Sequence, residues 1–204
     1  GQFSPTSEVG KITKSSPMGS LDHPFNPISL ALGAEAGFVA RTHDMDRKHM
    51  METFRRAHAH KGAAIVEVFQ NCNVFNDGAF EQITKKGARE KMLINLRHGQ
   101  PVTFGEDEEN GVIVENGVAK IVVVADVGTD ALLVHDETKQ DPSTAFMLSR
   151  LANRPDTPTP VGVFRAIDRT EYAEATQAQL ALAQEQQGPG DLGAMLRSAG
   201  TWSV

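Results

Sequence analysis

Apolar and polar positions predict a strand, a helix and a second strand in succession over residues 38–69. Residues 38–42 read as the first strand, and apolar side chains recur at helical spacing over 45–61. Residues 63–69 are almost continuously apolar, which is typical of a strand covered on both faces in a parallel sheet. The pattern therefore predicts a right-handed βαβ unit within an α/β fold.

The segments before this unit are less regular. Residues 28–36 form a short apolar helix after Pro27, a favoured first helical residue. Prolines and glycines interrupt residues 1–27, which are expected to be irregular. Asp44 and Asp46 are the expected N-terminal caps of the following helix.

The rest of the chain predicts shorter elements. Asn116-Gly117 between two alternating apolar runs predicts a hairpin over 111–122. The remaining expectations are helices over 79–97, 143–152 (capped by Ser143) and 171–187, strands over 132–134 and 163–167, an extended connector over 154–160, and a tail over 191–204.

Composition excludes several classes of protein. Lys and Arg total 20 against 26 Asp and Glu, and this net charge of −6 argues against a nucleic-acid-binding surface. No apolar run approaches the roughly 18 residues needed to span a bilayer, so no membrane association is expected. A single cysteine excludes an internal disulfide and indicates a reducing, cytoplasmic compartment.

Two residues stand out as candidates for chemistry. Glu67 lies within an apolar strand, where a carboxylate needs a partner or a function, and pairing with a basic side chain is the favoured explanation. Cys72 lies just past the same strand, where open α/β sheets place ligands. It is either a small buried side chain or a thiolate with a metal or redox role.

Other motifs carry little chemistry. The glycines of 188–193 match a dinucleotide fingerprint in letters, but no strand precedes them, so they indicate a loop. His58 and His60 fall on opposite helix faces and cannot share one metal ion. The acidic run 106–109 is expected to be a solvated turn.

Several segments resemble the beta subunits of 2-oxoacid:ferredoxin oxidoreductases. Residues 1–7 (GQFSPTS) are similar to the segment after the thiamine diphosphate motif of that family. Residues 15–27 (SSPMGSLDHPFNP), 37–41 (GFVAR) and 66–78 (VEVFQNCNVFNDG) match the same family. The asparagine-rich cysteine segment is most similar to members that act on 2-oxoglutarate.

The resemblance implies a fold and an organisation. Residues 1–100 would form the C-terminal part of a thiamine diphosphate-binding domain, with a parallel sheet and flanking helices. Residues 101–204 would form a family-specific extension containing the β-hairpin and a helical C-terminal segment.

It also implies a reaction. The enzyme would oxidatively decarboxylate a 2-oxoacid, 2-oxoglutarate above all, with coenzyme A, yielding acyl-CoA and carbon dioxide. Electrons would pass through a 4Fe-4S cluster to ferredoxin. Cys72 would be the fourth cluster ligand, and Gln2, Ser4 and Thr6 would lie on the thiamine diphosphate and substrate side.

The family's diphosphate motif, its asparagines for Mg²⁺ and three further cluster cysteines precede the position of Gly1. The resemblance therefore implies that this chain alone binds neither cofactor and shows no catalytic residue. Its expected partners are the N-terminal part of the beta subunit, the alpha subunit and ferredoxin. The alternative is a non-catalytic interaction module that kept the scaffold and lost the cofactors. Residues 171–187 and the tail through Trp202 are either a subunit contact or a free surface helix.

Overall fold

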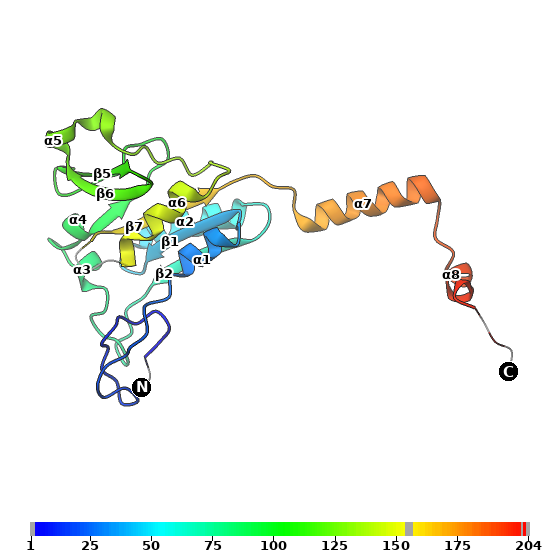
Figure 1. The fold of residues 1–204 in the computed structure, drawn as a ribbon, viewed down its shortest axis with the longest axis horizontal. Helices are drawn as coiled ribbons and strands as arrows, with labels where there is room; N and C mark the ends of the chain where they lie inside the picture. Colours follow the sequence, from blue (N-terminus) through cyan, green and yellow to red (C-terminus); the bar gives the residue numbers. More distant parts are fainter. Residues whose placement is uncertain (1–2, 154–156, 201, 203–204) are drawn as a thin grey trace. The chain divides into compact units, whose positions relative to one another are not determined.

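A computed structural model describes residues 3–153, 157–200 and 202. Contacts divide the chain into two compact units, Gly1–Asp168 and Arg169–Val204. The first unit contains a four-stranded and a three-stranded sheet (Figure 1). Its elements in chain order are α1 (Pro27–Gly33), β1 (Phe38–His43), α2 (Arg47–Ala59), β2 (Ala64–Phe69), α3 (Glu81–Thr84), α4 (Arg89–Met92), β3 (Leu93–Asn95), β4 (Thr103–Phe104), β5 (Asn110–Glu115), β6 (Val118–Val123), α5 (Val124–Val127), the 3-10 turn η1 (Thr129–Ala131), α6 (Ser143–Ser149), the 3-10 turn η2 (Leu151–Asn153) and β7 (Thr159–Ala166).

The four-stranded sheet confirms the strand–helix–strand prediction. Its strand order is β2-β1-β7-β3, and β1 and β2 run parallel, with Phe38 opposite Ala64 and His43 opposite Phe69. Helix α2 connects the two strands. β7 lies antiparallel to β1 and parallel to β3, so the sheet is mixed.

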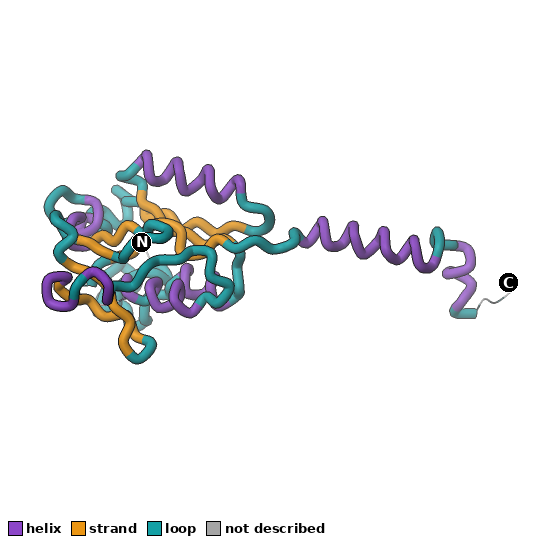
Figure 2. The backbone as a smooth tube through the Cα atoms, turned by 90° about the horizontal axis from the view of Figure 1, so that it is seen from above, coloured by secondary structure: helices purple, strands orange, loops and turns teal. Residues whose placement is uncertain are grey.

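Helices cover both faces of this sheet, as expected for an α/β fold. Phe38 and Ala40 of β1 pack in a cluster with Ala57 of α2, whereas Val39 packs in the larger core cluster on the other face. Figure 2 shows α2 on one side of the sheet. The larger cluster draws on α1, α6, β3, β5 and β7 as well as β1.

The prediction that residues 63–69 form a strand buried on both faces is wrong. β2 is an edge strand in the described chain, and its residues are exposed or only partly buried. Ile65 is exposed, so the face of β2 from which it projects is not fully covered. The fully buried strand is β1, which lies between β2 and β7.

β7 extends the strand expected over 163–167. It begins at Thr159 and occupies the second interior position of the sheet. Residues 159–160 of the expected connector therefore belong to a strand, and residues 154–156 of that connector lie outside the described part. Because β7 joins the sheet built by β1 and β2, the family-based division at residue 100 is not a break between compact units and stays a prediction.

The prediction of a helix over 79–97 is wrong for most of this stretch. Two single-turn helices, α3 and α4, occupy this stretch, and Leu93–Asn95 form β3. Gly87 separates the two helices with a φ of +86°, a conformation that other residues avoid. Leu93 pairs with Thr159, a partner that local spacing does not reveal.

The hairpin prediction is confirmed. β5 and β6 pair antiparallel, and Asn116 and Gly117 both have positive φ, as a tight hairpin turn requires. β4 extends the hairpin to a three-stranded sheet. The strand expected over 132–134 is wrong, because the structure has only an isolated bridge between Val134 and Pro101 there.

Helix ends differ in detail from the expectations. α1 begins at Pro27 as predicted but ends at Gly33, and Asn26 caps it by accepting the Ser29 N–H at 2.9 Å. Ser143 is the first residue of α6 and not its cap, and its N–H donates to Asp141 Oδ1 at 2.7 Å.

The second unit contains α7 (Tyr172–Gln187) and α8 (Leu192–Ser198). α7 matches the helix expected over 171–187, and neither helix has a buried residue. The expected tail thus contains a short helix, which Asp191 caps through the Ala194 N–H at 2.9 Å. Within the described ranges no helix has the length and apolarity to cross a bilayer.

Candidate functional site

Cys72 lies on a loop after β2, as the sequence predicted. This segment, residues 70–78, is called the Cys72 loop. The thiol is exposed, so the alternative of a small buried side chain is wrong. The backbone N–H groups of Phe75 and then Val74 hydrogen-bond to the sulfur and lower the pKa of the Cys72 thiol. A thiolate stabilised in this way is suited to metal ligation or redox chemistry.

Asn71 closes the loop around Cys72. Its side-chain oxygen accepts the Gly78 N–H at 2.9 Å, and its amide group donates to Asn73 Oδ1 and Asp77 Oδ1, both at 2.8 Å. A backbone bond from Asn76 N to Cys72 O at 2.9 Å tightens the turn further. Every hydrogen-bonding atom of the Asn71 side chain therefore shapes the loop.

Asp44 anchors the loop to the neighbouring strand. Its Oδ2 accepts the Asn71 N–H at 3.1 Å, while Asp46 alone caps α2 through the His49 N–H at 2.9 Å. The expectation that both aspartates cap the helix is therefore only half right. Parallel strands end at the same edge of a sheet, and this was the available signal that Asp44 and Asn71 would meet.

The N-terminal segment touches the same loop. Lys11 Nζ donates to Asn76 Oδ1 at 2.6 Å. Ser4 and Thr6 lie together in one turn, with their hydroxyl oxygens 2.9 Å apart, and both are exposed. Gln2 lies outside the described residues. The structure thus joins Ser4 to Thr6, and Lys11, which sequence reasoning missed, to the Cys72 loop.

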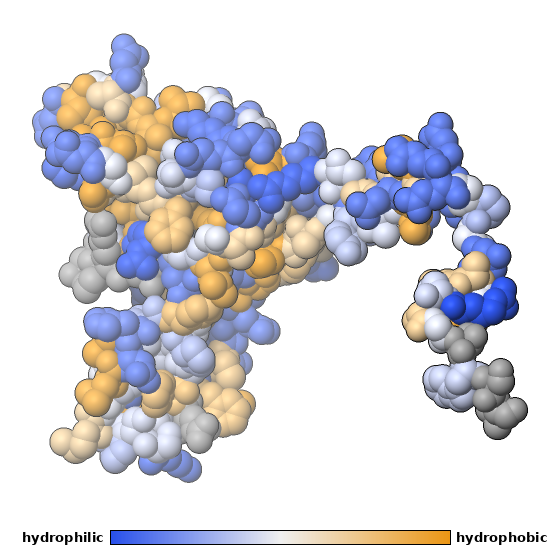
Figure 3. Space-filling model, turned by 45° about the vertical axis from the view of Figure 1, so that its right-hand side comes forward, coloured by the Kyte–Doolittle hydropathy of each residue, from blue (hydrophilic) through white to orange (hydrophobic). Residues whose placement is uncertain are grey.

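Large apolar side chains are exposed on the Cys72 loop and on the N-terminal segment that touches it. They include Val74, Phe75, Ile12, Met18 and Leu21, with exposed fractions from 71% to 95%. In Figure 3 orange and tan atoms are interspersed with blue on the lower part of the molecule. Side chains of this size are exposed together mainly on surfaces that contact another chain or domain.

The described residues can supply one ligand of a metal cluster. Among the described residues no group of three or more His, Cys, Asp or Glu side chains could hold a metal ion. An iron–sulfur cluster needs four ligands, usually cysteines, so Cys72 would need three from elsewhere.

Glu67 has the structural role that the sequence favoured. Its Oε2 accepts a hydrogen bond from Arg41 Nε at 2.6 Å, within the sheet and close to the start of the Cys72 loop. His58 and His60 are not brought together on a metal. The ring of His60 packs against Phe38 at 5.5 Å, and His49 hydrogen-bonds Thr42 at 2.8 Å.

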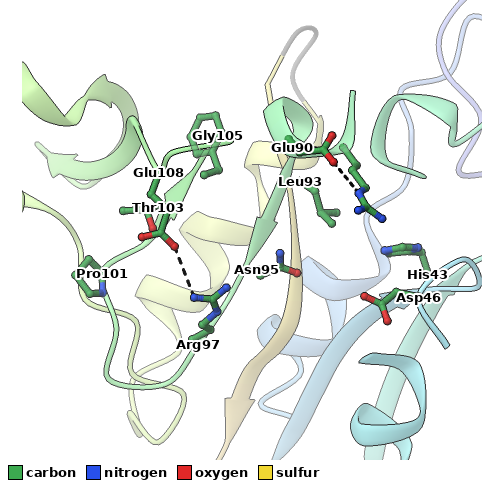
Figure 4. A pocket seen from close by; sticks show the side chains of 12 residues that line it. His43, Asp46, Glu90, Leu93, Asn95, Arg97, Pro101, Thr103, Gly105 and Glu108 are labelled. Carbon is green, nitrogen blue, oxygen red and sulfur yellow. Dashed lines mark hydrogen bonds and ion pairs between the residues drawn. The ribbon is translucent and has the colours of Figure 1, made fainter. Parts of the chain in front are cut away.

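A cavity of about 310 Å³ lies beside the end of β1 (Figure 4). His43 of β1, Asn95 of β3 and Arg97 are among the residues that line it. The sequence analysis missed these residues, because strands that are distant in the chain bring them together.

Comparisons with known proteins identify relatives of this chain. The chain is 48% identical over 206 residues to the 2-oxoglutarate oxidoreductase subunit KorB of Mycobacterium tuberculosis, covering 100% of this chain and 55% of that protein. It is 43% identical over 77 residues to the 2-oxoacid:ferredoxin oxidoreductase subunit beta of Saccharolobus solfataricus, covering 38% of this chain and 25% of that protein. The chain thus spans about half the length, or less, of these curated relatives.

A solved structure shares the fold. A 2-oxoglutarate:ferredoxin oxidoreductase from Magnetococcus marinus superimposes with a TM-score of 0.61 at 22% identity, covering 98% of this chain and 53% of that chain. No protein-family model matches the sequence. The likeness along the whole chain to a KorB subunit and the shared fold lead to one conclusion: the chain belongs to the beta subunits of the 2-oxoacid:ferredoxin oxidoreductases.

Proposed function

We propose that the chain is a part of an enzyme that oxidatively decarboxylates 2-oxoglutarate with coenzyme A, giving succinyl-CoA and carbon dioxide. Electrons leave through a 4Fe-4S cluster to ferredoxin. The proposal is supported by 48% identity to a 2-oxoglutarate oxidoreductase subunit along the whole chain. The observation that carries the role of this chain is the exposed Cys72 thiol in the loop that follows β2, which the Asn71 side chain closes with three hydrogen bonds.

Cys72 is proposed as the fourth ligand of the cluster. Two features fit this role: the thiol is accessible, and backbone N–H groups of the Cys72 loop already hydrogen-bond to its sulfur. Hydrogen bonds to the sulfur atoms are one of the means by which proteins set cluster potentials. The N-terminal part of the beta subunit would supply the other three ligands and cover the apolar side chains around the loop.

The N-terminal turn is proposed to face thiamine diphosphate and its Mg²⁺. When bound, thiamine diphosphate supplies the carbanion chemistry of decarboxylation. Gln2, Ser4 and Thr6 would orient the cofactor and substrate, and the Ser4 and Thr6 hydroxyls lie close enough to act as one polar group. The alpha subunit would complete the site.

A substitution at Cys72 tests the cluster assignment. In the complete enzyme, Cys72→Ala should lower the iron content and ferredoxin reduction together, because a cluster with one missing ligand is bound weakly. Iron analysis and reduction of ferredoxin by 2-oxoglutarate measure the two quantities. Ser15→Ala, an exposed change in the N-terminal segment, serves as the control and should alter neither.

The same experiment separates the proposed enzyme from a non-catalytic module. If iron content and ferredoxin reduction both survive Cys72→Ala, Cys72 is not a ligand. If the complete complex never contains iron and never reduces ferredoxin, the scaffold has only a binding role.

The substrate is tested separately. A carboxylate at the far end of 2-oxoglutarate calls for an Arg or Lys in the substrate pocket, a group that pyruvate would leave without a partner. The intact complex should therefore turn over 2-oxoglutarate faster than pyruvate at equal concentration, and the opposite preference would contradict the substrate assignment.

A further inference from the structure

The cavity beside β1 is lined by polar and charged side chains that have no part in the proposed function. It lies in the first unit, and neither Cys72 nor Ser4 nor Thr6 lines it. Its volume of about 310 Å³ is at the lower end of the range for small-molecule sites. Figure 4 shows Asn95 between Arg97 on one side and His43 on the other.

Two of the three carboxylates that line the cavity, Asp46 and Glu90, are already engaged, and the third is Glu108. Asp46 Oδ1 accepts the His49 N–H and caps α2. Glu90 accepts the Gly87 N–H at 2.6 Å with one oxygen and Arg89 Nε at 3.0 Å with the other. These two carboxylates therefore have few positions left for a ligand.

The donors of the cavity are largely unused. In the part of the chain that the structure describes, Arg89 donates through Nε alone, so its two terminal amino groups remain available. Among the described residues Arg97 has one partner, Glu108, which also lines the cavity and forms a long ion pair with it at 3.6 Å, between side chains that are 66% and 61% exposed. Such exposed pairs contribute little and yield readily to a better partner. Within the described ranges the side chains of Asn95 and Thr103 make no hydrogen bond.

His43 forms the most buried part of the wall. The residue is 4% exposed, and its Nδ1 has no hydrogen-bond partner in the described structure. Burial lowers the pKa of His43, the carboxylates of Asp46 and Asp44 oppose this effect, and the nearby Arg89 adds a smaller lowering. The neutral imidazole adds a polar atom without adding a charge.

We propose that this cavity binds a small oxyanion, a carboxylate or a phosphate group, between Arg89 and Arg97. Guanidinium groups recognise both groups through paired hydrogen bonds, and Asn95 and Thr103 can complete the set of donors. The site goes beyond the proposed function, because it involves neither the Cys72 loop nor the N-terminal turn.

Calorimetric titration of the complete enzyme tests the site. Inorganic phosphate, succinate and acetate are titrated separately at low ionic strength. At least one should bind, and Arg89→Gln and Arg97→Gln should each weaken that binding by about tenfold, since each removes a charge-assisted hydrogen bond. Arg55→Gln is the matched control, because Arg55 is a similarly exposed arginine on α2, paired with Glu52 at 3.5 Å, and does not line the cavity. It should leave the affinity unchanged.

The three anions distinguish the possible sources of the ligand. Tighter binding of phosphate identifies a phosphate group, and tighter binding of succinate than of acetate identifies a dicarboxylate that uses both arginines. Either result supports the site. Absence of binding by all three, or equal weakening by Arg55→Gln, overturns it. No outcome depends on iron content or ferredoxin reduction, so the proposed function is tested independently.

Discussion

At the residue scale, Arg41 carries a charge in the interior of the main sheet. Its side chain is 2% exposed, Nε donates to Glu67 at 2.6 Å, and Nη1 donates to Pro160 O at 3.2 Å. The guanidinium carbon lies 5.0 Å from the ring centre of Phe69 and 5.4 Å from that of Phe164. Burial lowers the pKa of Arg41, and Glu67 opposes this effect. Glu67 is thus the counterion that lets β1 keep a buried arginine.

Glu67→Gln should therefore destabilise the protein strongly. The change leaves Arg41 buried without a counterion, and breaking a buried pair in this way costs about 3–5 kcal/mol of unfolding free energy. Urea titration measures the loss. Glu52→Gln, which removes an exposed pair with Arg55, should cost less than about 1 kcal/mol. Equal losses of unfolding free energy in the two variants would show that the buried Arg41–Glu67 pair stabilises the protein no more than an exposed pair does.

His135 makes stability depend on pH. Its ring is buried and lies 2.8 Å from Val163 O, so Nε2 carries the proton and Nδ1 has no partner within the described residues. Burial lowers the pKa of His135 below its ordinary value of 6.5, although the Val163 hydrogen bond opposes the shift. Protonation would place a charge and an unsatisfied N–H in the core.

The unfolded chain takes up this proton more readily than the folded one, so the free energy of unfolding should fall as pH drops below about 6.5. His135→Gln should reduce the slope between pH 7.5 and 5.5, because glutamine can still donate to Val163 O but does not titrate. Urea titrations across this range measure the slope. His58→Gln, at an exposed position, should keep the original slope. An unchanged slope in His135→Gln would refute the assignment.

At the element scale, β7 holds the two halves of the first unit together. It pairs with β1 on one side and β3 on the other, and almost all of its residues are buried. Its course depends on Gly162, which has a φ of +115°. A Cβ added there would lie 2.9 Å from the backbone oxygen of Leu96. A side chain at this position therefore meets both backbone strain and a close neighbour.

Gly162→Ala should lower the unfolding free energy by about 2–4 kcal/mol, the sum of a strained backbone and an overpacked contact. Thermal and urea unfolding measure the change. Gly190→Ala is the matched control, because its added Cβ meets nothing within 4 Å and its φ is not in the left-handed region. If both variants are equally stable, β7 tolerates a side chain at Gly162, and the close approach of Leu96 does not contribute to the unfolding free energy.

At the scale of the whole molecule, the described residues carry one thiol and no group of three metal-ligating side chains. The isolated chain, supplied with iron and sulfide under reducing conditions, should therefore acquire no stable cluster. Visible absorption and iron analysis check this outcome. The complete beta subunit, treated in the same way, is the positive control, and one bound cluster on the isolated chain would contradict the assignment of Cys72 as a single ligand.

Local pattern was enough for the βαβ unit, the Asn116-Gly117 hairpin and the position of Cys72 at a strand end. Each depends on residues close in sequence: apolar spacing, turn chemistry, and the loop that follows a strand. The same reasoning expected a basic partner for Glu67, because an isolated buried charge is costly. Family resemblance added a proposed role for that thiol, which spacing alone left open.

Strand order and the make-up of the sites needed the folded chain. Arg41 and Pro160 are 119 positions apart, and no local pattern places β7 between β1 and β3. That pairing made β1 the buried strand and left β2 at the edge, whereas hydrophobicity suggested that residues 63–69 would be covered on both faces. Asp44 beside Asn71, Lys11 beside Asn76, and the cavity of Arg89 and Arg97 likewise arise from contacts between distant segments. Hydrophobic periodicity indicates which residues are buried. Which strands lie next to one another in a sheet is decided by the packing of the whole unit.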